Sequence, residues 1–131
     1  MKLKIGELAK LTGCSIQTIR YYEKEGLLKA IKRSEGRYRL YDNHAIKQLI
    51  FIKHCRSLGI TLSEIRQLIY LRDSPETTCN NVNALVDRHN KQVDLRIKEL
   101  KELKRQLYIL RRKCTIGRSV KDCGILLELS Q

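Results

Sequence analysis

Apolar side chains recur every seven residues along one long stretch, 79–114, which contains neither glycine nor proline. One position of this repeat is occupied by Cys79, Val86, Val93, Leu100, Leu107 and Cys114. The companion position is occupied by Val82, His89, Arg96, Leu103 and Leu110. This spacing predicts a single long helix that pairs with another along a coiled-coil seam, and polar residues inside such a seam are typical of positions that fix its register.

Each end of this seam is marked by a cysteine. Cys79 and Cys114 are five heptads apart, which is roughly 50 Å along a helix, so they cannot share a ligand within one chain. If two such helices pair antiparallel, Cys79 of one chain lies beside Cys114 of the other, and Cys123 is within reach through a short loop. We therefore predict an antiparallel homodimer with a three-thiol site, made of Cys79, Cys114 and Cys123, at each end of the seam.

The N-terminal part predicts two short helices joined by a turn. Ile5, Leu8 and Leu11 share one face of the first, and Ser15 is a good N-cap for the second, which ends at Gly26. This is helix-turn-helix spacing, and the second helix suits a recognition helix in a DNA major groove. Its candidate DNA contacts are Ser15, Gln17, Thr18, Arg20, Tyr21 and Lys24.

A basic, alternating segment follows, and it predicts a two-stranded wing with a turn at 34–36. The spacing of two places Arg37, Arg39 and Tyr41 on one face, where they could hold phosphate oxygens, and Tyr38 is a further candidate contact. The alternative is an ordinary edge hairpin that its charges keep soluble.

Two more helices are expected at about 43–57, capped by Asp42-Asn43, and at about 62–72, capped by Thr61 or Ser63. The only proline, Pro75, lies in a short polar joint that predicts a domain boundary. The expected fold is mainly α, with three parts. These are a winged helix-turn-helix DNA-binding domain (1–72), a linker with a long antiparallel coiled-coil dimerisation helix (73–113), and a metal-binding loop with a short C-terminal helix (114–131).

The net charge of +13 predicts a polyanionic partner, although charge alone does not separate DNA from RNA or a membrane surface. The sequence has no apolar run of transmembrane length and no signal peptide, so we expect a cytoplasmic protein with no membrane partner. It shows no Ser/His/Asp set, carboxylate pair or phosphate-binding loop, so we do not expect an enzyme.

An odd number of cysteines, five, favours free thiols over a disulfide framework. Three thiolates suit Hg(II) or Pb(II), whereas Cd(II) and Zn(II) usually take a fourth ligand. Two alternatives are a structural zinc at the dimer end and a redox sensor that joins Cys114 to Cys123. Cys55 is expected to be buried and inert, and Cys14 to be structural or incidental.

Three stretches, IGELAKLTGCSIQTIRYYEKEGLL (5–28), GRYRLY (36–41) and FIKHCRSLGITLSEIRQLI (51–69), resemble the MerR family of bacterial transcription activators, and the resemblance extends over the whole chain. Within that family, LRDSPETTC (71–79), VNALVD (82–87) and CGILLEL (123–129) resemble the cadmium/lead-responsive branch. The mercury-responsive branch has similar cysteine spacing. The resemblance implies Cd(II) or Pb(II) as effector, with Hg(II) and Zn(II) as alternatives.

The resemblance also implies a mechanism. A dimer would bind double-stranded promoter DNA whose spacer is too long for RNA polymerase, and metal binding would make it bend and untwist the duplex until the promoter elements align. By resemblance, Arg20 and Tyr21 match the recognition helix, Arg37 and Arg39 the wing, and Tyr41 a residue that holds backbone phosphate. A different hypothesis is a metal-buffering protein whose basic half binds nucleic acid nonspecifically.

Overall fold

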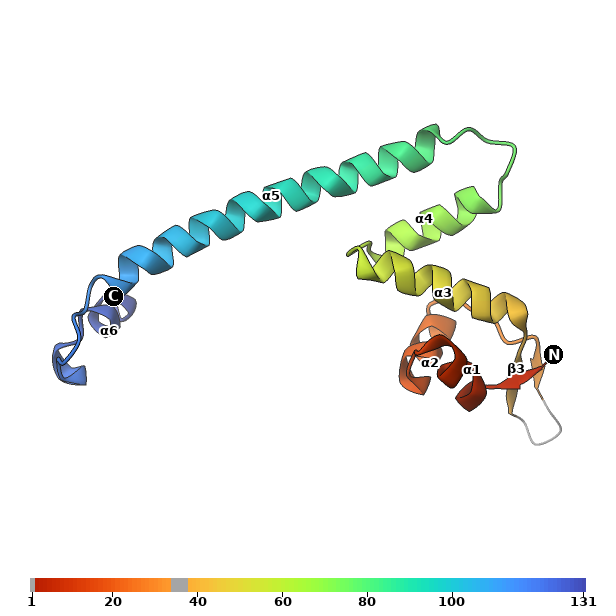
Figure 1. Cartoon of the computed structure of the whole chain (residues 1–131), viewed down its shortest axis with the longest axis horizontal. Helices are drawn as coiled ribbons and strands as arrows, with labels where there is room; N and C mark the ends of the chain where they lie inside the picture. The colour runs from red at the N-terminus through yellow and green to blue at the C-terminus, as the bar shows by residue number, and fades with distance from the viewer. Residues whose placement is uncertain (1, 34–37) are drawn as a thin grey trace. The chain divides into compact units, whose positions relative to one another are not determined.

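The computed structural model describes residues 2–33 and 38–131, and the side chains of residues 32 and 33 are not among those described. The chain divides into two compact units, Met1–Val82 and Asn83–Gln131, and each is described by itself. The elements in chain order (Figure 1) are β1 (Leu3–Lys4), α1 (Ile5–Thr12), α2 (Ile16–Lys24), β2 (Lys32–Arg33), β3 (Arg39–Tyr41), α3 (Asn43–Ser57), α4 (Leu62–Arg72), α5 (Asn80–Arg111), the 3-10 helix η1 (Val120–Asp122) and α6 (Gly124–Leu129).

Helices α1 and α2 form the predicted helix-turn-helix. Gly13 ends α1 with a φ of 72°, a left-handed conformation that glycine adopts without a steric penalty. Ser15 then caps α2, because its Oγ accepts a 3.0 Å hydrogen bond from the backbone N–H of Thr18. A residue from α3 secures the turn, since Lys53 Nζ donates to the carbonyl of Thr12 at 3.1 Å.

The wing belongs to a three-stranded antiparallel sheet with the strand order β1-β3-β2. Leu3 pairs with Tyr41 in this sheet, and Arg33 pairs with Arg39. The prediction of two strands was therefore incomplete. A strand of two residues is too short to show alternation, so β1 was not visible in the sequence. The predicted turn at 34–36 and Arg37 lie outside the described residues.

Helices α3 and α4 have the predicted bounds, and side-chain caps explain why. Asp42 accepts hydrogen bonds from the backbone N–H groups of His44 and Ala45 at the start of α3. Thr61, rather than Ser63, caps α4. Thr61 Oγ1 accepts from the N–H of Glu64 at 3.2 Å, and Glu64 Oε1 accepts from the N–H of Thr61 at 2.9 Å, which is a capping box.

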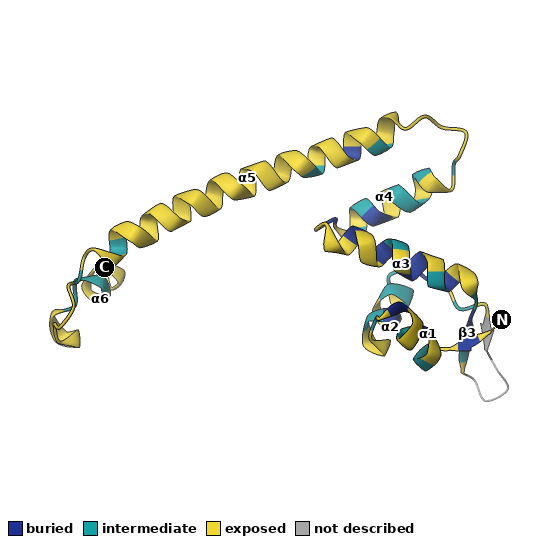
Figure 2. Ribbon diagram, in the orientation of Figure 1, coloured by how far each residue is buried: buried dark blue, intermediate teal, exposed yellow. Residues whose placement is uncertain are grey.

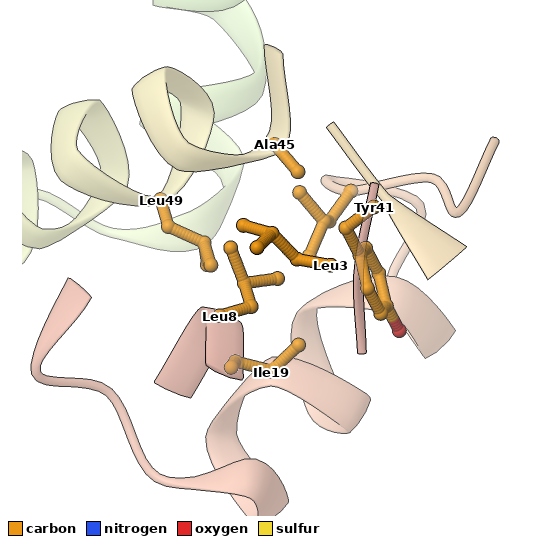
Figure 3. Close-up of a cluster of buried hydrophobic side chains, with 7 residues drawn as sticks. Leu3, Leu8, Ile19, Tyr41, Ala45 and Leu49 are labelled. Atoms are coloured by element: carbon orange, nitrogen blue, oxygen red, sulfur yellow. The ribbon is translucent and has the colours of Figure 1, made fainter. Parts of the chain in front are cut away.

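Two hydrophobic clusters hold the first unit together. The first joins the sheet to α1, α2 and α3, and Figure 3 shows its side chains meeting between these elements. Its buried members are Leu3, Leu8, Ile19, Leu28, Tyr41, Ala45 and Leu49. The second cluster joins α3 and α4 to Leu27, three residues beyond the end of α2, and its buried members are Leu27, Ile52, Cys55, Ile60 and Ile65. Tyr22 of α2 packs against both clusters.

The segment between α4 and α5 belongs to the first unit, which extends through Val82. It helps to line a partly open cavity of about 310 Å³ between itself and the helices α3 and α4. The walls of this cavity include Phe51, Arg72, Pro75, Cys79 and Val82. The joint that the sequence placed between domains therefore packs against the DNA-binding unit.

Helix α5 begins in the last residues of the first unit and forms most of the second, and it is one unbroken helix of 32 residues, about 48 Å long, as the heptad pattern predicts. Figure 2 shows that it is exposed along most of its length. Its apolar seam is exposed too: 63% of Leu100 and 56% of Leu107 is accessible. Among the described residues, none of the helices is long and apolar enough to cross a membrane.

Candidate nucleic-acid interface and metal centre

Helix α2 has one buried and one exposed face, as a recognition helix requires. Ile19 is fully buried beneath it, whereas 47% of Tyr21 is exposed. The other exposed candidates are Ser15, Gln17, Arg20 and Lys24, and Thr18 is half-buried. Ser15 is already bonded within the helix cap, because its hydroxyl donates to Thr18 Oγ1 at 2.8 Å. The exposed face of α2 is therefore basic and polar.

The wing is joined to α2 through the carboxylate of Glu23. Arg39 Nη1 pairs with Glu23 Oε2 at 2.6 Å, and the hydroxyl of Tyr41 donates to Glu23 Oε1 at 2.6 Å. Both bonds involve a charged group and belong to the stronger class of hydrogen bonds. Glu23 is largely buried, with 15% of its side chain exposed, so little water competes for it. Burial raises the pKa of Tyr41, and the bond to Glu23 raises it further, which keeps the phenol a hydrogen-bond donor.

This arrangement corrects one prediction. Arg39 and Tyr41 do share a face of β3, as their spacing predicts, but that face is turned towards α2. The ring of Tyr41 has no exposed surface, so it is a core residue here and is not placed to hold a phosphate. Arg39 retains 40% exposure of its side chain, and Tyr38 is 61% exposed. Arg37 lies outside the described residues.

Glu23 was not among the sequence candidates, although the sequence contains a signal for it. It follows the buried Ile19 by one helical turn, so it falls on the inward face of α2. An acidic residue on the buried face of an otherwise basic helix requires a partner. The wing supplies that partner, which links the two predicted DNA contacts into one unit.

Two of the three candidate metal ligands meet in the second unit. After α5 the chain forms a turn, residues 112–124, which we call the hook. The two ends of the hook lie so close together that a Cβ at Gly124 would collide with the carbonyl oxygen of Lys113. Gly117 allows the reversal with a φ of 92°. Arg111 Nη1 donates to the carbonyl of Cys114 at 2.9 Å, and the N–H of Cys123 donates to Val120 at 3.2 Å.

The thiols of Cys114 and Cys123 are consequently neighbours, and both are half-buried. The backbone N–H of Leu126 lowers the pKa of the Cys123 thiol, and a hydrogen bond with Cys114 lowers it further. A lowered pKa favours the thiolate, which is the form that binds metal ions. The hook therefore holds two candidate sulfur ligands next to each other.

Cys79, the third candidate, is exposed and immediately precedes α5. The whole of α5 lies between it and the hook of the same chain. Within the described part of one chain, no group of three or more His, Cys, Asp or Glu side chains is assembled as a metal site. Within one chain, the candidate ligands are thus divided into the thiol pair of the hook and Cys79.

The two remaining cysteines have structural positions. Cys55 lies in the second core cluster, and burial raises the pKa of its thiol, as expected for an inert core cysteine. Cys14 packs against the first cluster in the turn between α1 and α2. All five cysteines are in the described part of the chain, and they form no disulfide.

Comparisons with known proteins agree with this architecture. The MerR helix-turn-helix family of regulatory proteins matches residues 3–71, and the MerR DNA-binding family matches residues 46–108. The ZntR homolog of Haemophilus influenzae, a transcriptional regulator of the helix-turn-helix type, is 41% identical over 98% of this chain and 94% of its own. The mercuric resistance operon regulatory protein of Bacillus cereus is 35% identical over 98% of each chain.

A solved structure extends the match to the second unit. The transcription regulator PbrR691 from Ralstonia metallidurans CH34, in complex with lead(II), has a TM-score of 0.88 and 52% identity. The alignment covers 97% of this chain and 98% of that one. Helix α5 and the hook are therefore included, together with the recognition helix and the wing. The chain belongs to the MerR helix-turn-helix family of DNA-binding transcriptional regulators.

Proposed function

We propose that this protein binds promoter DNA as an antiparallel homodimer and activates heavy-metal resistance genes when Cd(II) or Pb(II) binds to its cysteines. The observation that supports this most directly is the hook, which holds two thiols together without a third. Each metal ion would be bound by Cys114 and Cys123 of one chain and by Cys79 of its partner.

The exposed seam of α5 supports the dimer. Val86, Val93, Leu100 and Leu107 are each between 40% and 63% exposed, and they follow one line along the helix. A helix with an uncovered apolar seam needs a partner to bury it. Antiparallel pairing of two copies covers this seam, and it also brings the beginning of one α5 to the end of the other.

The ligand set fits a soft cation. Three thiolates provide negative charge and polarisable sulfur, which Pb(II), Hg(II) and Cd(II) prefer to hard oxygen ligands. No histidine occurs after His89, so the hook itself offers no imidazole for a tetrahedral zinc site. The related lead(II) complex supports Pb(II), and the related mercuric operon regulator keeps Hg(II) as the alternative effector.

The DNA-binding unit supplies the output. Gln17, Arg20, Tyr21 and Lys24 would read the major groove, while Arg39 and Tyr38 would contact the backbone beside it. A dimer presents two such units, and a change in their separation deforms the duplex between them. Such deformation costs a few kcal/mol, which protein contacts to phosphates can offset. RNA polymerase would then engage a realigned promoter.

A thiol redox regulator is a second candidate, because Cys114 and Cys123 are in contact and could be oxidised to a disulfide. Reporter induction under anaerobic, reducing conditions separates the two. Induction by metal ions without any oxidant supports metal sensing, whereas induction only by peroxide supports the redox alternative.

A promoter-reporter titration tests the proposal. The operator is located by footprinting and placed before a reporter gene. Expression of the reporter is then measured during titration with Pb(II), Cd(II), Hg(II) and Zn(II). We expect protection of one dyad-symmetric site and induction by Pb(II) or Cd(II) at the lowest concentrations. Salt-sensitive binding to all DNA without a protected site, or no response to any of the four ions, would contradict it.

A further inference from the structure

The side-chain amide of Gln48, in α3, is buried. Its nitrogen and its oxygen bond to two different parts of the DNA-binding unit. Only 7% of the residue is exposed. Its Nε2 donates to the carbonyl of Leu27 at 3.1 Å, and its Oε1 accepts from Arg72 Nη2 at 2.9 Å. The orientation of the amide follows from these partners, because a reversed amide would set its NH₂ group against a guanidinium that can only donate.

The first partner secures the end of the recognition helix. Leu27 lies three residues beyond the last residue of α2, is buried, and donates its N–H to the carbonyl of Tyr22 in that helix at 2.9 Å. With Gln48 bonded to its carbonyl, both backbone polar groups of Leu27 are satisfied. The path of the chain at the end of α2 therefore depends on where Gln48 is held.

The second partner reaches the cavity next to Cys79. Arg72 is the last residue of α4, and its guanidinium lies 4.9 Å from the centre of the Phe51 ring. Its Nε also bonds to Asp73 Oδ1 at 3.2 Å. Arg72 and Phe51 form one wall of the cavity, and the segment from Pro75 to Cys79 forms another. A planar guanidinium can stack, bridge and donate at the same time, which a lysine cannot.

We propose that Gln48 and Arg72 are positioning residues that couple the Cys79 segment to the recognition helix. This inference rests on the proposed metal-sensing function. When Cys79 is drawn into a metal site, the wall that it forms with Pro75 shifts against Arg72. A buried amide oxygen without a donor is unfavourable, so Gln48 follows Arg72 and carries the carbonyl of Leu27 with it. The coupling thus stays inside one unit: it crosses the cavity between the Cys79 segment and Arg72, and it runs through two hydrogen bonds from Arg72 to Leu27.

The test compares Gln48→Met and Arg72→Gln with a matched control, Lys53→Met. Lys53 lies in the same helix and also ties it to a backbone carbonyl, that of Thr12, but it is not part of the cavity wall. For each full-length variant we measure the operator affinity of the metal-free protein, the affinity for Pb(II), thermal stability, and the ratio of induced to uninduced transcription.

We expect Gln48→Met and Arg72→Gln to lower the induction ratio on the order of tenfold while operator and Pb(II) affinities stay within about threefold of wild type. Lys53→Met should lower the melting temperature and leave the induction ratio unchanged. Arg72→Lys can still donate to Gln48, so its induction ratio should lie between the ratios of Arg72→Gln and wild type. Such an intermediate ratio would indicate that the loss in Arg72→Gln is not caused by a fold defect.

Unchanged induction ratios in the two variants would overturn the coupling and leave the proposed function intact. A loss of induction that merely parallels a loss of operator affinity, or an equal loss in Lys53→Met, would also overturn it. If the wild-type protein responds to no metal ion, the proposed function fails, and the coupling fails with it.

Discussion

The hydroxyl of Tyr41 donates a 2.6 Å hydrogen bond to the carboxylate of Glu23, and this bond ties the wing to the recognition helix from the inside. The same carboxylate pairs with Arg39, a candidate phosphate contact. Glu23 thus sets the distance between the two DNA-contacting elements. Because it is largely buried, this distance is a property of the folded domain and does not require DNA.

Tyr41→Phe removes this bond without changing the packing of the ring. We expect a loss of about 1.5–3 kcal/mol in the free energy of unfolding, since the acceptor is charged. The raised pKa of Tyr41 gives the loss a pH dependence. The stabilisation is complete below the unfolded value of 10.0 and declines above it, as the unfolded phenol ionises first.

Chemical denaturation of both proteins between pH 7 and about pH 11 measures this difference. The difference between wild type and Tyr41→Phe should be constant up to about pH 9.5 and should shrink above pH 10. Tyr38→Phe is the control, because Tyr38 is exposed and the loss of its hydroxyl should change the free energy of unfolding only slightly. A difference that grows with pH would show that the bond is not formed as described.

The sequence predicted those features that depend on local chemistry. Asp42, Thr61 and Ser15 cap their helices with side chains that bond to nearby backbone groups, and such signals lie within four residues of the helix start. The seven-residue repeat likewise depends on one helix alone. These parts of the fold, including the single long α5, are therefore confirmed.

Features that depend on distant contacts were not predictable. The strand β1 exists only because it pairs with β3, and the direction in which Tyr41 points depends on the position of α2. Gln48 and Arg72 are far apart in the sequence, and no motif joins them. The spacing of the cysteines led to a hypothesis about their roles. The close approach of Lys113 and Gly124, which closes the hook, is a contact of the folded chain that the spacing does not predict.

Gly124→Ala tests that closure. The added methyl group collides with the carbonyl of Lys113, so the hook must open and the pair Cys114 and Cys123 must separate. We expect the affinity for Pb(II) to fall on the order of tenfold or more, which corresponds to about 1.4 kcal/mol or more. Operator binding by the metal-free protein should not change, because the hook contains no proposed DNA contact.

Competition with a chromophoric chelator measures the Pb(II) affinity of Gly124→Ala. Gly6→Ala is a suitable control, since a Cβ at Gly6 meets no atom within 4 Å. If Gly124→Ala bound Pb(II) as tightly as Gly6→Ala does, the preformed thiol pair would not be needed for binding.

Leu100→Glu tests the seam of α5. Leu100 is 63% exposed in the single chain, at the middle of the proposed interface. A buried, unpaired charge there should weaken the dimer by on the order of 3–5 kcal/mol and abolish operator binding at nanomolar protein concentrations. Leu95→Glu is the matched control, because Leu95 is 57% exposed on the same helix but off the seam.

Analytical ultracentrifugation of both variants gives the answer. A monomer for Leu100→Glu and a dimer for Leu95→Glu would support pairing through the heptad seam. The opposite pattern would place the interface on another face of α5.

A mixed dimer shows whether the metal site is shared between antiparallel chains. Cys79→Ser and Cys114→Ser subunits, each with a different affinity tag, are co-expressed, and the heterodimer is purified through both tags. Bound Pb(II) is then counted for the heterodimer and for each variant homodimer. We expect one tightly bound ion in the heterodimer and none in either homodimer, because only the mixed pair restores one complete set of three thiols. A heterodimer that binds no ion, or a Cys79→Ser homodimer that binds two, would contradict a shared site.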